Sequence, residues 1–287
     1  MPELGTVITA IVTPFDAEGA VDEAAFVEIL EHLAANGSDG VVVAGTTGEA
    51  STMTDAEHLG VIDLAVKERP EGLKVIAGTG SNDTHHACTL TARASELGVD
   101  GILSVNPYYN RPPRAGIVRH YEEIATSTEL PILLYNIPQR TGSDMPNDLL
   151  AELAQKLGNV VGVKQANNDN LEMIDGLQLY AGNDDVFAKV LDLGGSGGIL
   201  TASHVAGTEF RRMVDEPDNR QEIHESLLPL FDALAIAPAA TSSKAALTLQ
   251  GLPGGHVRLP YVDATDEEVS KIRAALEARG LLGAVAS

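Results

Sequence analysis

The residue of this sequence with the clearest capacity for chemistry is a lysine at the end of an apolar segment. Residues 160–164 read Val-Val-Gly-Val-Lys, a run typical of a strand buried on both faces. Alternation along a strand places Val160, Gly162 and Lys164 on one face. Burial disfavours an ammonium group and lowers its pKa from about 10.4; at roughly 7–8 the neutral amine attacks carbonyl groups. The alternative is a lysine that ends the strand and extends its ammonium to solvent.

Other polar side chains follow other predicted strands at the corresponding position. Thr46 and Thr47 lie in a glycine-flanked turn, Tyr135 ends a strand, and Arg140 follows a proline turn. Backbone amides of such a turn can hold a carboxylate, and an arginine can clamp one. We expect the Tyr135 hydroxyl to lie near Lys164. The structural alternatives are a helix cap for the threonines, a buried tyrosine with any polar neighbour, and a surface ion pair for Arg140.

Two further observations concern the same region. Glu49, which ends the threonine turn, is expected to be structural and to accept backbone amides of that turn. No set of His, Asp and Glu has the spacing of a metal site, so we expect no metal.

The elements that position these residues alternate between strands and helices. Apolar runs predict strands at 6–15, 40–46, 74–80, 101–106, 131–135, 160–164, 177–181 and 198–201. Apolar periodicity predicts helices between them at 22–36, 55–69, 84–97, 115–126, 147–157 and 185–193, with Asp22, Asp55 and Asp83 as N-caps. Eight alternating strands predict a (β/α)8 TIM barrel, whose active site lies at the carboxyl ends of the strands. A doubly wound open sheet is the alternative, but no glycine-rich dinucleotide fingerprint follows the first strand.

The strand pattern stops near residue 222. Helical patterns at 221–237, 242–250 and 266–279 follow it, interrupted by a glycine- and proline-rich stretch. We therefore predict two parts, a catalytic barrel at 1–222 and a C-terminal helical domain at 223–287.

Composition restricts the class of protein. The formal net charge is −22, which argues against partners such as nucleic acid or an anionic membrane surface. A single cysteine excludes a disulfide framework. The first residues do not resemble a signal peptide, and no apolar run reaches the ~20 residues of a membrane span. These features predict a cytoplasmic protein.

Together, the turn at 45–49, the Tyr-Asn-Ile-Pro segment at 135–138 and the Gly-Val-Lys ending at Lys164 resemble the dihydrodipicolinate synthase / N-acetylneuraminate lyase family of class I aldolases. The resemblance covers essentially the whole chain. Arg140 and the pair Tyr108-Tyr109 resemble the synthase branch, because the lyase branch is expected to lack that arginine.

The resemblance implies a mechanism and a set of roles. Lys164 would form a Schiff base with pyruvate, so that no cofactor is required, and Tyr135 would act as general acid and base. Thr47 would relay the proton to Tyr109 of a neighbouring subunit. The resulting enamine would attack aspartate semialdehyde. The substrate-binding groups implied are the amides of Thr46 and Thr47, the side chain of Arg140, and the backbone of Gly182 and Ile199.

The resemblance also implies an assembly and a pathway. The family is usually a homotetramer formed as a dimer of dimers, and its synthase branch serves the biosynthesis of lysine and diaminopimelate. At the lysine-feedback site of regulated relatives the chain matches at three positions and differs at three. The matches are His58, Asn82 and Tyr108, and the differences are Ala50, Asp55 and His86. We therefore expect weak or absent inhibition by lysine.

Two alternatives to the synthase remain open from the sequence. Gln165 and Asn183 depart from the residues usual in the synthases, which leaves room for another pyruvate-dependent aldolase or dehydratase acting on a sugar acid or hydroxy-oxo acid. The other alternative is a catalytically silent barrel that binds small carboxylates.

Overall fold

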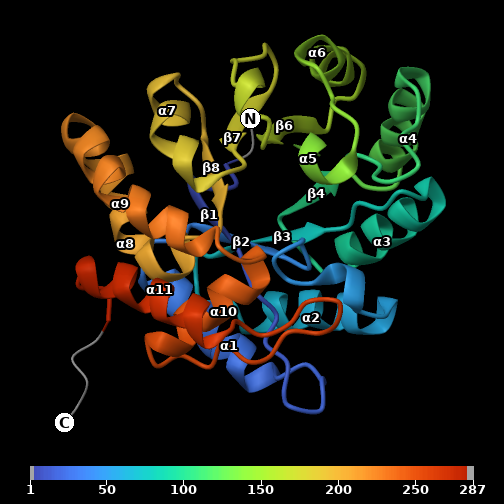
Figure 1. Ribbon diagram of the computed structural model, residues 1–287. Coiled ribbons are helices and arrows are strands. Elements are labelled where there is room, and N and C mark those ends of the chain that lie inside the picture. Colours follow the sequence, from blue (N-terminus) through green and yellow to red (C-terminus); the bar gives the residue numbers. More distant parts are fainter. Residues whose placement is uncertain (1–2, 283–287) are drawn as a thin grey trace.

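The computed structural model describes residues 3–282. The opening residues 1–2 and the end of the predicted C-terminal part, 283–287, lie outside the described residues. Eight parallel strands form a closed barrel in sequence order (Figure 1). The strands are β1 (Val7–Ala10), β2 (Gly40–Val43), β3 (Lys74–Gly78), β4 (Gly101–Val105), β5 (Ile132–Asn136), β6 (Val160–Gln165), β7 (Gln178–Ala181) and β8 (Gly197–Leu200). The predicted TIM barrel is confirmed, and the open sheet is wrong because β8 pairs with β1.

The first predicted strand, 6–15, was too long. Only Val7–Ala10 pair as β1, although the buried apolar pattern continues through Ile11 and Val12 to Phe15. Beyond Ala10 the backbone leaves the barrel wall, and Phe15 forms isolated bridges with Val21 and His256. Apolar residues beyond Ala10 are buried although they lie outside the strand, so the apolar pattern could not locate the end of β1.

The long helices of the barrel are α1 (Glu23–Ala35), α2 (Asp55–Glu68), α3 (Thr84–Glu96), α4 (Arg114–Thr126), α6 (Asn147–Lys156), α7 (Phe187–Asp192) and α8 (Ser203–Asp215), and α5 (Pro138–Thr141) is a single turn after β5. Asp22 and Asp83 are N-caps as predicted, but Asp55 is the first residue inside α2. Its cap is Thr54, which forms a capping box with Glu57.

Helix α8 was absent from the prediction. Its backbone is kinked at Ala206, although its apolar residues gather on one face. Between β6 and β7, where no helix was predicted, the described chain contains only the 3-10 turn η2 (Asn168–Asn170). One position in the ring of outer helices is therefore filled by a short loop.

The barrel wall separates two apolar clusters. The outer cluster lies between strands and helices, and the inner one contains Leu133, Tyr135 and Ile199. Strand β6 has an irregularity opposite Ile132, so Val160 belongs to the outer cluster while Val161 packs against the inner one. The expectation that Val160 shares the face of Lys164 was therefore wrong, because the bulge interrupts the alternation.

Three helices follow α8 and η4 (Pro217–Asn219). They are α9 (Arg220–Leu234), α10 (Ala239–Leu249) and α11 (Asp266–Ala278). Figure 1 shows them in orange and red at one side of the barrel, beside α1 and α8. Within residues 3–282 no single helix meets the length and hydropathy of a membrane span; one pair, Pro217–Leu234 with Ala239–Leu249, meets them only jointly and across a 110° bend.

Candidate active site

A cavity of about 900 Å³ opens where the carboxyl ends of the strands meet the C-terminal helices. Six of the sequence-predicted residues contribute to its lining: Thr46, Thr47, Tyr135, Arg140, Lys164 and Gly182. These residues come from the ends of β2, β5, β6 and β7, so the barrel brings together groups that are up to 136 positions apart in the chain. Residues Ala237 to Ala239 close one side of the cavity.

Lys164 lies at the centre of this arrangement. It pairs in register with Tyr135 across β5 and β6, and only 6% of its surface is exposed. Burial, assisted by the nearby positive charge of Arg140, lowers its pKa to about 7, against a smaller opposing effect of Asp184. The alternative of a lysine extended to solvent is excluded by this burial. The shift raises the neutral fraction of the amine at pH 7 by roughly a thousandfold.

Tyr135 presents its ring to the lysine. The Lys164 Nζ lies 4.4 Å from the centre of the ring, and the tyrosine is as buried as the lysine. Burial raises the pKa of Tyr135 to about 12, with Arg140 opposing. At neutral pH the pair therefore combines an amine that is about half neutral with a protonated phenol, which can donate a proton and take it back.

Arg140 is held in the single helical turn α5, which begins at Pro138. Its side chain is exposed and borders the cavity. Because it acts on the pKa values of both Lys164 and Tyr135, it is electrostatically part of the same site. A guanidinium at the mouth of a cavity suits an incoming carboxylate.

Asp184 was not singled out from the sequence, although it follows β7 in a polar segment that the strand-end argument includes. Its Oδ1 accepts hydrogen bonds from the backbone amides of Thr201 (3.0 Å) and Ala202 (3.1 Å), and its Oδ2 accepts one from the Thr201 hydroxyl at 2.7 Å. It borders the cavity, and burial raises its pKa. A fixed carboxylate at this point favours the cationic form of Lys164.

The turn that carries Thr46 and Thr47 has left-handed backbone at both ends. Ala44 has φ 54° and Glu49 has φ 57°, a conformation that costs a non-glycine residue roughly 1–2 kcal/mol. Inside the turn the Glu49 amide donates to the Thr46 carbonyl at 3.1 Å. Neither threonine acts as the cap of the short helix η1 (Ala50–Thr52) that follows, so the capping alternative is wrong.

The expectation that the side chain of Glu49 accepts amides of its own turn is wrong. The side chain is fully buried, and its oxygens accept hydrogen bonds from the Lys244 Nζ at 2.5 Å and from the Arg258 backbone amide at 2.9 Å. The expectation failed because these partners lie some 200 residues further along the chain. The start of the turn also lies against β3. A Cβ at Gly78 would lie 2.5 Å from the Ala44 carbonyl oxygen.

Two predicted site residues lie elsewhere. Ile199 is fully buried in the inner cluster and is absent from the cavity lining. Tyr109 is 89% exposed and does not line the cavity of its own chain, whereas Tyr108 does. Across the described part of the chain, no group of three or more His, Cys, Asp or Glu side chains is arranged to hold a metal ion.

Comparison with known proteins gives a consistent result. The sequence model of the dihydrodipicolinate synthetase family matches residues 3–279. The 4-hydroxy-tetrahydrodipicolinate synthase 1 of Halalkalibacterium halodurans is 40% identical over 286 residues, covering 95% of this chain and 96% of the relative.

Solved structures of the same group share the fold. The enzyme of Cyanidioschyzon merolae with lysine bound is 39% identical, with a TM-score of 0.93 over 97% of this chain and 99% of its own. The chloride-inhibited enzyme of Acinetobacter baumannii complexed with pyruvate is 32% identical, with a TM-score of 0.92 over 97% and 100%. The matches in sequence and in barrel structure extend over nearly the full length of this chain, which therefore belongs to the dihydrodipicolinate synthetase family.

Proposed function

We propose that this chain is the lyase that condenses pyruvate with aspartate semialdehyde to give 4-hydroxy-tetrahydrodipicolinate, a step of lysine and diaminopimelate biosynthesis. The observation that supports it most directly is Lys164, buried against Tyr135 with a pKa lowered to about 7. The named function of the relatives and the complex of one of them with pyruvate agree with this activity.

The first half of the reaction uses the amine as a nucleophile. The neutral Nζ of Lys164 adds to the ketone carbon of pyruvate, and Tyr135 donates its proton to the departing hydroxyl, which leaves as water. The product is a protonated imine that withdraws electrons from the methyl group. The Tyr135 phenolate then takes a methyl proton, which gives the enamine and restores the phenol. The lysine itself is the electron sink, so the proposal requires no metal or organic cofactor.

The second half forms the carbon–carbon bond. The enamine carbon attacks the aldehyde of aspartate semialdehyde, whose carboxylate Arg140 binds at the mouth of the cavity. The amine of this substrate then attacks the imine carbon, closes the ring and releases Lys164. The backbone of Gly182 contributes to the wall of the cavity, whereas Ile199 lies outside its lining.

Pyruvate is held through its carboxylate by the amides of Thr46 and Thr47. Thr47 passes a proton between Tyr135 and a tyrosine at position 109 of a second subunit. The exposure of Tyr109 supports this assignment, because a hydroxyl that cannot reach its own cavity is available to a neighbour. The functional unit is then at least a dimer, and we propose a cytoplasmic homotetramer formed as a dimer of dimers, in which 1–222 is the catalytic domain and 223–287 the helical domain.

The test combines trapping with turnover. Pyruvate followed by borohydride should add a reduced pyruvyl group to Lys164, detected by peptide mass spectrometry, and Lys164→Ala should remain unmodified. A coupled assay should then show turnover of aspartate semialdehyde. Turnover of a sugar acid in its place would assign the chain to a different aldolase activity, and an unmodified wild-type chain would exclude Schiff-base chemistry.

A further inference from the structure

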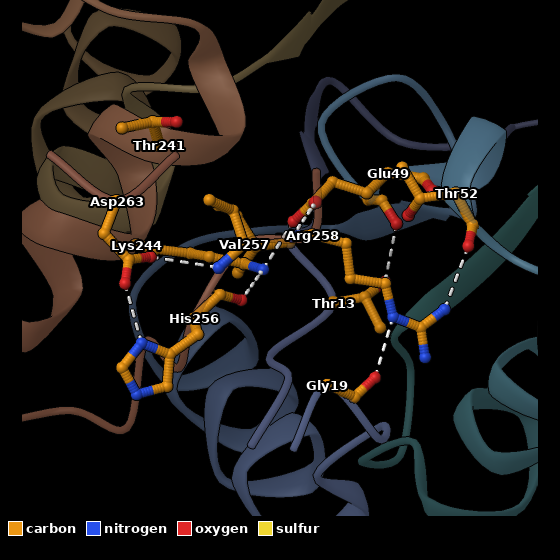
Figure 2. A network of polar contacts seen from close by, with 12 residues as sticks. Thr13, Gly19, Glu49, Thr52, Thr241, Lys244, His256, Val257, Arg258 and Asp263 are labelled. Carbon is orange, nitrogen blue, oxygen red and sulfur yellow. Dashed lines mark hydrogen bonds and ion pairs between the residues drawn. The ribbon is translucent and has the colours of Figure 1, made fainter. Parts of the chain in front are cut away.

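Two cations of the C-terminal segment, Lys244 and Arg258, lie on the ring of Phe15 in the loop after β1. The Lys244 Nζ and the Arg258 guanidinium lie 4.5 and 4.1 Å from the centre of the buried Phe15 ring. Lys244 also donates to the His256 carbonyl at 2.6 Å, and His256 pairs with Phe15 through its backbone. Figure 2 shows this network from close by, with the Lys244 ammonium directed toward Glu49 and the Arg258 guanidinium toward the carbonyls of Gly19 and Thr52.

The acceptor of this network is the last residue of the threonine turn. Glu49 receives the Lys244 ammonium on one carboxylate oxygen and the Arg258 backbone amide on the other. Both Glu49 and Lys244 are essentially inaccessible to solvent, at 0% and 2% exposure of their side chains. A carboxylate anchored at both oxygens has little freedom to rotate, and its backbone is fixed with it.

A second contact holds the turn from the barrel side. The Thr13 hydroxyl donates to the Gly48 carbonyl at 2.9 Å, and Thr13 precedes Phe15 by two residues. The Arg258 side chain donates to the Thr52 carbonyl at 3.0 Å, beyond the turn. The strained, left-handed residue Glu49 thus lies where contacts from two distant segments converge. Strain of this kind persists where the surroundings enforce it and is concentrated at functional sites.

We propose that Glu49, anchored by Lys244 and the Arg258 amide, is a positioning residue that holds the amides of Thr46 and Thr47 in place for the carboxylate of the 2-oxo acid. The C-terminal helical segment thereby acts on the first step of the reaction through Glu49. This inference rests on the proposed function. It adds that a buried ion pair between Glu49 and Lys244 of α10 aligns the turn that binds pyruvate.

The decisive variant removes both charges together, because removing one would leave the other buried and unpaired. The double variant Glu49→Leu/Lys244→Met keeps side chains of similar length in the same space. It leaves the Arg258 amide and the His256 carbonyl without these partners, so we expect a lower melting temperature and compare trapping well below it. The rate of borohydride trapping at low pyruvate should fall by about 100-fold, the loss associated with a misplacement of about 1 Å. KM for pyruvate should rise, while KM for the aldehyde, which depends on Arg140, should change less than about twofold.

Two single variants complete the test. Lys244→Arg keeps a cation for Glu49 and should retain trapping within about threefold of the wild type. Glu57→Gln removes an ion pair made by the same Arg258 side chain but does not touch the turn, so it should trap pyruvate as the wild type does. A loss of trapping in Glu57→Gln equal to that of the double variant would overturn the proposal, because a general weakening of the segment would then suffice.

A double variant with wild-type trapping and wild-type KM for pyruvate would also overturn it. If the double variant does not fold, Glu49→Gln decides the question. It keeps an acceptor for Lys244 but offers an amide nitrogen to the Arg258 backbone amide, and it should raise KM for pyruvate by about 10-fold; an unchanged KM would contradict the positioning role. Absence of trapping in the wild type itself would instead refute the proposed function, so the two failures are distinguishable.

Discussion

The Nζ of Lys164 lies 4.4 Å from the centre of the Tyr135 ring, at the ends of two paired strands. Both side chains are buried in the same part of the barrel. Burial lowers the pKa of the Lys164 amine and raises that of the Tyr135 phenol. The amine loses its proton near pH 7, and the phenol keeps its own to about 12.

The pH dependence of imine formation should report the pKa of Lys164. Only the neutral amine attacks, and the folded-state pKa is lowered to about 7, so the trapping rate at low pyruvate should rise about 10-fold per pH unit below 7 and level off above it. Stopped-flow or quenched trapping between pH 5 and 9 measures this directly. A rate still rising near pH 10 would show that the lysine is not desolvated.

Replacement of Arg140 should have two separable effects. In Arg140→Met the loss of a positive neighbour raises the pKa of Lys164, so the trapping profile moves to higher pH, and KM for the aldehyde rises by at least about 10-fold. Arg140→Lys is the matched control. It keeps the charge and hence the profile, but loses the planar two-point contact with a carboxylate. An identical pH profile in all three proteins would rule out the electrostatic coupling.

Asp184 should act in the opposite sense. Its charge favours the ammonium form, so Asp184→Asn lowers the pKa of Lys164 below about 7 and moves the trapping profile to lower pH. The amide still offers one oxygen to the Thr201 and Ala202 amides. Asn183→Ser, at the neighbouring cavity residue, changes no charge and should leave the profile in place. A shift toward higher pH in Asp184→Asn would contradict the assignment.

Inhibition by lysine should be weak or absent. The family resemblance implies that His86 stands where regulated relatives carry an acid for the ammonium of the inhibitor. The His86 Nε2 pairs with Asp55 at 3.0 Å. Loss of a charged contact worth about 2 kcal/mol or more weakens binding of the inhibitor by roughly 30-fold. Dose–response curves should therefore show little inhibition below about 10 mM. His86→Glu is the matched gain-of-function variant. Sub-millimolar inhibition of the wild type would contradict the prediction.

Stability should fall in mild acid because of two buried neutral histidines. Burial lowers the pKa of His120 and of His204 from 6.5 to about 4. Their contribution is complete above about pH 6.5, where neither state binds the proton, and is lost progressively toward the folded value of about 4. Between pH 7 and 5 this amounts to about 2 kcal/mol for each residue, or roughly 10 °C in Tm together. Burial also lowers the pKa values of His58 and His224, which add to the decrease. Melting curves test it, and His204→Gln should remove the share of His204, about 2 kcal/mol.

Much of the fold could be predicted because its signals are local. Each of the eight strands overlaps a predicted one, and the buried apolar run before Lys164 predicted β6. The ends of strands were less predictable, since Ile11 and Val12 are buried without pairing as strand. Helix α8 was missed even though its apolar residues gather on one face, a signal that was present in the sequence.

The cavity residues were predictable for a related reason. A parallel barrel brings the carboxyl ends of all strands to one face, so polar residues after each strand are candidates before any contact is known. The partners of Glu49 were not predictable in this way, because Lys244 lies on a helix outside the repeated pattern. Asp184 was passed over because its role depends on the amides of Thr201 and Ala202, which no sequence spacing connects to it.

The close approach of Gly78 to the Ala44 carbonyl has a consequence for any attempt to enlarge the pocket. A side chain at position 78 would push the left-handed Ala44, and with it the threonine pair, before it changed the volume available to a bulkier 2-oxo acid. The Gly78 carbonyl is in addition bound by the His58 ring at 2.8 Å. Engineering of donor-substrate range therefore has to vary β3 and the turn after β2 together, because neither can accommodate a change made in the other alone.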